Sequence, residues 1–116
     1  MARTTALSVS YMDMTFDVDV AGQVAVKLQT ADWEVNFRAS KAHLVALIGI
    51  DAANWDERRS IRAGESAGAA VFWASDGGAA TMMIGSDDET WDVAFALPVA
   101  AVTEIASGGL RALSDG

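Results

Sequence analysis

The pentapeptide Trp33-Glu34-Val35-Asn36-Phe37 decides the fold, because a near-copy returns as Trp91-Asp92-Val93-Ala94-Phe95. Each copy alternates apolar and polar side chains, which is the period of a β-strand with one buried face. Each copy also runs directly into a segment with helical spacing of its apolar residues. Tryptophan is a rare residue, so the repeat indicates a duplicated strand-then-helix unit.

The strands predicted around the two copies follow from the same period of two and from the turn residues between them. They lie at residues 11–20, 23–29, 33–37, 70–74, 81–84 and 90–97. Alternation also places the aromatic side chains of these strands in the core, with Trp33 and Trp91 partly exposed at strand ends. Residues 51–68 show no clear period and are predicted to be irregular.

Two helices are predicted from helical spacing and capping residues. Ser40 suits the N-cap of the first helix, and Gly49 suits its end. Pro98 suits the first position of the second helix, where its missing amide hydrogen costs nothing, and Gly108-Gly109 is predicted to end that helix.

These elements predict an α+β fold, in which an antiparallel sheet has two helices on one face. Residues 1–116 are expected to form a single pseudo-duplicated domain of order βββα-βββα, with repeat units at roughly 8–50 and 66–109.

The composition limits the class of protein. With 116 residues, 52% of them hydrophobic, the chain can bury an ordinary core. It has no cysteine, which excludes disulfides and thiolate metal sites. No signal peptide and no apolar run of about 20 residues is visible, so a cytoplasmic location without membrane contact is expected. A net charge of −8 disfavours non-specific phosphate binding and favours solubility. Solubility alone is the preferred interpretation of this charge, and a basic protein partner is the alternative.

The motif Gly64-Glu65-Ser66-Ala67-Gly68 fits the G-x-S-x-G nucleophile elbow and resembles the Gly-Glu-Ser-Ala-Gly of carboxylesterases. The residues after it are strand-like rather than helical, and the chain's single histidine, His43, precedes the serine. A loop that leads into a strand is therefore the preferred interpretation. We expect no enzyme activity, no cofactor and no metal site, with His43 an ordinary helix residue.

The irregular segment contains the best candidates for a functional contact. Trp55 lies beside Arg58, Arg59 and Arg62, which are three of only eight cationic side chains. Tryptophan with arginine is typical of interface hot spots, although neighbouring acids compensate much of the local charge.

The stretch from Val35 to Ile48, together with the hairpin strands from Ala70 to Pro98, resembles a DNA sliding-clamp domain over about two-thirds of the chain. The resemblance implies self-association into a ring of six domains around DNA and a link to DNA replication. It also implies that Arg38, Lys41, Arg58, Arg59 and Arg62 are DNA-facing or interface cations. The chain departs from the family in the low positive charge of its predicted helices, which leaves DNA as a weakly supported partner.

Three hypotheses for function follow. The first is a non-enzymatic, clamp-like domain that acts through self-association and protein contacts. The alternative is a small acidic inhibitor or immunity-type protein, in which Asp13, Asp17 and Asp19 on one strand face meet a basic protein. The third is a single-strand nucleic-acid binder of the Whirly kind, which the acidic strand face disfavours.

Overall fold

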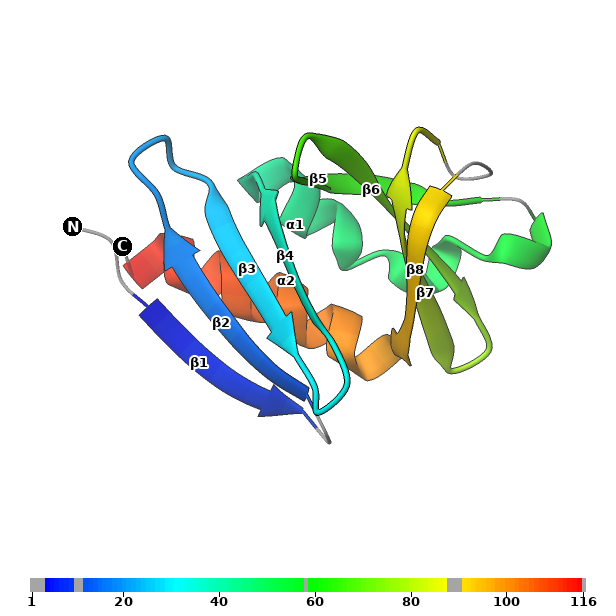
Figure 1. Ribbon diagram of the computed structural model, residues 1–116, viewed down its shortest axis with the longest axis horizontal. Helices are drawn as coiled ribbons and strands as arrows, with labels where there is room; N and C mark the ends of the chain where they lie inside the picture. Colours follow the sequence, from blue (N-terminus) through cyan, green and yellow to red (C-terminus); the bar gives the residue numbers. More distant parts are fainter. Residues whose placement is uncertain (1–3, 10–11, 58, 88–90, 116) are drawn as a thin grey trace.

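The computed structural model describes residues 4–9, 12–57, 59–87 and 91–115 and is an α+β protein, as predicted (Figure 1). Its strands, α-helices and short 3-10 helices (η) are, in chain order, β1 Thr4–Val9, β2 Met12–Val18, β3 Val24–Gln29, β4 Glu34–Ala39, α1 Lys41–Leu47, η1 Ile50–Ala52, η2 Trp55–Glu57, β5 Ile61–Ser66, β6 Ala69–Asp76, β7 Ala79–Gly85, β8 Trp91–Pro98 and α2 Val99–Asp115. Neither α-helix in these described ranges is long and apolar enough to cross a membrane.

The strands form one antiparallel sheet in which each strand pairs with its neighbour in the sequence, from β1 to β8. The pairing is weakest in the middle, because β4 and β5 share only the pair Arg38↔Glu65. The register of β5 then shifts between Arg62 and Glu65. The sheet therefore consists of two four-stranded halves joined at a narrow junction, which is visible in Figure 1 where β4 meets β5.

Each helix follows four strands, so the predicted order of three strands before each helix is wrong. The sequence analysis missed β1 and β5. In β5, Gly64 and the register shift interrupt the alternation on which strand prediction depends. Gly64 has φ +99°, and a Cβ atom there would lie 2.8 Å from the Arg38 carbonyl oxygen. Only glycine fits this close approach of the two strands.

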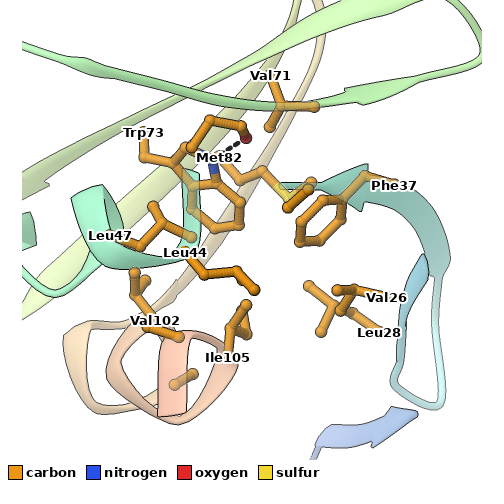
Figure 2. Packing of buried hydrophobic residues seen from close by; sticks show 14 of the residues in the cluster. Val26, Leu28, Phe37, Leu44, Leu47, Val71, Trp73, Met82, Val102 and Ile105 are labelled. Carbon is orange, nitrogen blue, oxygen red and sulfur yellow. Dashed lines mark hydrogen bonds between the residues drawn. The ribbon is translucent and has the colours of Figure 1, made fainter. Parts of the chain in front are cut away.

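The core lies between the sheet and the two helices, which pack on the sheet and on each other. Figure 2 shows Leu44 of α1 and Ile105 of α2 directed toward Phe37 and the strand side chains, and all three are buried. The largest buried side chain is Trp73, whose indole Nε1–H donates to the Ala63 carbonyl oxygen at 2.9 Å. This hydrogen bond satisfies the indole N–H, which is the only polar group of the fully buried Trp73 ring.

The second helix continues through Gly108-Gly109, which corrects the prediction that it ends there. Gly109 is buried against α1, and a Cβ atom there would lie 2.8 Å from both Leu44 methyl carbons. The glycine therefore permits close packing of the two helices instead of ending one. As a result Arg111 belongs to α2, which the shorter predicted helix left without a cation.

The two copies of the Trp-acid-Val-x-Phe motif lie at the start of the fourth strand of each half of the chain, with Trp33 just before β4 and Trp91 as the first residue of β8. In β4 the motif lies inside the sheet, and its Val35 and Phe37 are buried. In β8 the motif lies at the sheet edge, where Trp91 and Val93 keep 41% and 45% of their surface exposed. The two copies of the motif thus have different surroundings, because β4 is an inner strand of the sheet and β8 is an edge strand.

Candidate functional site

A groove of about 650 Å³ lies on the outward face of the sheet, the face turned away from the helices. Strands β2, β3 and β4 form its base, and their alternation directs every second side chain into it. The outward residues that line it are Thr15, Asp17, Ala25, Lys27, Asn36 and Arg38. The β5–β6 hairpin forms one wall through Glu65, Ala67 and Gly68.

Cross-strand register explains why these side chains converge. Asp17 lies opposite Ala25, Ala25 opposite Arg38, and Arg38 opposite Glu65, so the four residues form one row across β2 to β5. Directly opposed residues of antiparallel strands share a face. The small Ala25 side chain between Asp17 and Arg38 leaves the row hollow at that point.

The charged side chains of this outward face form ion pairs and a hydrogen bond with neighbouring residues. Arg38 Nη1 lies 3.7 Å from Asp19 Oδ2, and Lys27 Nζ lies 3.5 Å from Glu34 Oε1. Asn36 Nδ2 donates to Glu34 Oε2 at 3.0 Å. This hydrogen bond, followed by the attraction of Lys27, lowers the pKa of the Glu34 carboxyl. Both cations of this face are thus paired with carboxylates beside the groove.

His43 reaches the groove from α1 and connects the helix to the β4–β5 junction. Its Nδ1 accepts from the Gly64 amide at 3.2 Å and from the Ser40 amide at 3.4 Å, so its ring proton is assigned to Nε2. Its own amide donates to Ser40 Oγ at 3.2 Å, which completes a capping box around the predicted N-cap. The prediction of an ordinary helix residue missed this bridging role.

The serine of the G-x-S-x-G motif lies on a β-hairpin. Ser66 ends β5, its Oγ donates to the Asn36 carbonyl oxygen at 2.7 Å, and the turn residues Ala67 and Gly68 have φ +50° and +85°. A nucleophile elbow requires a strand followed by a helix, whereas β6 follows here. The two positive φ values match a type I′ turn, so the motif is used as a tight turn.

The predicted cations are not gathered in one place. Arg38 lines the groove, whereas Lys41 is exposed at the start of α1. Arg59 is exposed and pairs with Glu57 at 3.5 Å, and Arg62 is exposed on β5. The half-buried Trp55 lies in η2.

Arg58 lies outside the described residues.

The three predicted acids differ in their surroundings. Asp13 is exposed on β2, and Asp17 lines the groove. Asp19 stabilises the connection between β2 and β3. Its Oδ1 accepts hydrogen bonds from the Ala21 and Gln23 amides at 2.9 and 3.0 Å, and its Oδ2 faces Arg38.

The groove also contains Lys27, Asn36 and Glu65, which sequence reasoning did not select. Alternation places Lys27 and Asn36 on the outward face, and that signal was present in the sequence. Their proximity to Glu65 depends on the β4–β5 junction, for which the sequence has no local signal. Within the described residues, no three His, Cys, Asp or Glu side chains are placed to hold a metal ion.

The sheet edge at β8 is the second candidate surface. Trp91 and Val93 are exposed there, and in the described part of the chain only β7 pairs with this strand.

No family model, curated protein or solved structure matches the chain.

Proposed function

We propose that this chain is a non-enzymatic interaction domain that self-associates through the edge strand β8. The observation that carries the proposal is the exposure of Trp91 and Val93 at the edge of the sheet. An edge strand presents backbone N–H and C=O groups that another strand can pair with. Proteins commonly protect such edges with lysine or with a proline inside the strand. Here Asp92 is the strand's one charged residue, and Pro98 stands at its end.

Comparison with β4 indicates what the edge lacks. Val35 of β4 is 6% exposed and belongs to the buried core, whereas the equivalent Val93 of the edge strand β8 is 45% exposed. A strand from a second copy, paired with β8, would provide the missing neighbour. The apolar area that becomes buried would then favour association.

The resemblance to a sliding-clamp domain is consistent with this mode of assembly. The sheet has two edges, β1 and β8, and pairing β8 of one copy with β1 of the next would extend the sheet between copies. Such head-to-tail contacts close into a ring when the rotation between copies allows it. A ring is therefore one form that the proposed self-association takes.

Charge gives little support to a DNA-encircling ring. The exposed positions of α1 and its C-cap include Lys41 but also Val45 and Ile48. The exposed positions of α2 include Arg111 and the uncharged Thr103. A protein surface that compensates phosphates needs many cations. We therefore propose self-association without proposing DNA as the ligand.

Light scattering over a range of protein concentrations tests the proposal directly. The wild-type protein is expected to form a discrete oligomer, and Val93→Lys is expected to shift it to monomer because a charge would be buried at the new interface. Val45→Lys is the matched control, since Val45 is similarly exposed (50%) but lies on α1. A wild-type protein that stays monomeric at high concentration, or equal dissociation by both variants, contradicts the proposal.

A basic protein is a second candidate partner, favoured by Asp13 and Asp17 on the outward face of β2. These side chains and the net charge of −8 would accelerate association with a basic surface. Asp13→Asn with Asp17→Asn is expected to slow association with a basic partner at low salt. An unchanged association rate contradicts this candidate.

A further inference from the structure

We infer that His43 is a pH sensor at the β4–β5 junction. The neutral imidazole holds the junction closed, and the protonated ring releases it. The junction is the narrowest part of the sheet, because only Arg38 and Glu65 pair there. The inference concerns α1, β4 and β5, so it is independent of self-association through β8.

The acceptor nitrogen of His43 serves both strands of the junction. Nδ1 accepts from the amide of Ser40, which directly follows β4, at 3.4 Å and from the amide of Gly64 in β5 at 3.2 Å. The ring therefore joins the two strands beside their single residue pair.

A ring with a proton on both nitrogens cannot make these two hydrogen bonds. The neutral imidazole has one acceptor nitrogen, whereas the imidazolium has none and donates from both. A proton on Nδ1 would point at the two amide hydrogens, so both bonds would be lost together. Because Gly64 is buried, the loss of its acceptor is costly as long as the junction stays closed. Protonation thus favours a state in which the Gly64 amide reaches water, and the stabilising contribution of these bonds is lost as the pH falls.

The opening is expected to be local. Further along the strands, Ser66 Oγ donates to the Asn36 carbonyl oxygen at 2.7 Å, and this bond does not depend on the histidine. The next strands are paired continuously, with seven residue pairs between β6 and β7. Release of His43 should therefore expose the backbone near Gly64 and leave β6 and β7 folded.

The ring can be reached by protons, because His43 is half-buried and lines the outward groove. The charged side chains that line the groove with it are Asp17 of β2, Lys27 of β3, Arg38 of β4 and Glu65 of β5. The two cations are paired with Glu34 and Asp19, so carboxylates surround the groove and favour a positive ring there. They do not replace the acceptor that the two amides lose at Nδ1.

The two helices add little charge to these surroundings. On α1 itself, Lys41 is exposed at the start of the helix. The second helix meets α1 at Leu44 and Gly109, and none of its described residues lines the groove. The hydrogen bonds to Nδ1 therefore determine how the junction responds to protonation.

The experiment is native-state hydrogen exchange followed by NMR between about pH 7.5 and about pH 5. His43 is the chain's single histidine and the chain has no cysteine, so its ring is the one side chain of a type that ordinarily changes charge in this range. Exchange is expressed as protection factors, which correct for the intrinsic effect of pH. The protection of the Gly64 amide is expected to fall at least about tenfold as the ring is protonated. The protected amides of β6 and β7 should keep their protection.

His43→Asn is the matched control, because its side-chain oxygen can accept near the position of Nδ1 and does not titrate. In this variant the protection of Gly64 is expected to be independent of pH over the same range. If the variant fails to fold, the comparison of Gly64 with β6 and β7 in the wild type still decides, with the ring protonation followed by the His43 Cε1–H chemical shift.

Unchanged protection of Gly64 after the ring is protonated overturns the inference, and so does a ring that stays neutral down to about pH 5. The same loss of protection in His43→Asn overturns it as well, because the histidine would then not be the sensor. An equal loss throughout β6 and β7 would mean global destabilisation instead of an opening at the junction, which also contradicts the inference.

Discussion

The indole ring of Trp33 packs against the phenyl ring of Phe95, with ring centroids 4.6 Å apart and ring planes inclined by 42°. The first aromatic residue of one motif copy therefore contacts the last aromatic residue of the other. Because Trp33 precedes β4 and Phe95 lies in β8, the contact joins the two halves of the sheet on the side away from the β4–β5 junction.

A double-mutant cycle on Trp33→Ala and Phe95→Ala is expected to give a coupling energy of about 0.5–1.5 kcal/mol, because tilted aromatic pairs gain this much beyond burial. Urea unfolding of the two single variants and the double variant measures it. Trp33→Ala combined with Val45→Ala on α1 should be additive. Additivity of the Trp33 and Phe95 changes would show that the ring contact does not couple the two halves.

Gly109→Ala is expected to destabilise the protein by about 1–3 kcal/mol, because the added methyl group would overlap the Leu44 side chain. Ser107→Ala, at an exposed position of the same helix, is expected to change the free energy of unfolding by less than about 0.5 kcal/mol. Thermal unfolding measures both. The loss should shrink in a Leu44→Ala background, and an equal loss there would mean that helix packing is not its cause.

His43→Ala is expected to cost about 1–3 kcal/mol, because the buried Gly64 amide would lose its acceptor and the capping box would be broken. Asparagine places a side-chain oxygen near the position of Nδ1, so His43→Asn should retain part of this stability. Chemical denaturation compares the variants. Equal losses in both would indicate that ring packing, not the acceptor atom, is what the fold requires.

Ala67→Asn is expected to stabilise the protein by about 0.5–1 kcal/mol, because Ala67 has φ +50° and asparagine tolerates this conformation better. The neighbouring Gly68 would complete an Asn-Gly type I′ turn. Ala79→Asn, in strand β7, should not stabilise the protein. A fall in melting temperature for Ala67→Asn would argue against the type I′ geometry.

The pKa of Glu34 is expected to rise toward its ordinary value in Asn36→Ala, because the hydrogen bond from Asn36 is the main cause of its lowering. A carboxyl with a lowered pKa in the folded state contributes stability above its unfolded pKa. That contribution is lost as the pH falls through the folded pKa. Carbon-detected NMR titration of Glu34 measures the shift, with Asn54→Ala as the control. An unchanged pKa in Asn36→Ala contradicts the assignment.

The outward groove shows how far sequence reasoning extends toward a candidate site. Asp17 was placed on the polar face of its strand from alternation, and it lines the groove. The same alternation in β3 directs Lys27 to the outward face, although sequence reasoning did not select this residue. The approach of Glu65 was not predictable, because it depends on one residue pair between β4 and β5 and on the irregular register of β5.

The sequence by itself determined the α+β class, most strands and the start of α1. These features depend on the local period of apolar residues and on short-range capping, as at Ser40, whose hydroxyl meets an amide three residues later. Only the tertiary structure decided the features that depend on contacts between distant segments. Gly109 resembles a helix terminator in the sequence, yet it lies inside α2 because Leu44 of the other helix packs against it. In the same way, Val35 of β4 is buried in the core and the equivalent Val93 of the edge strand β8 is exposed, because burial depends on which distant segments pack against each position.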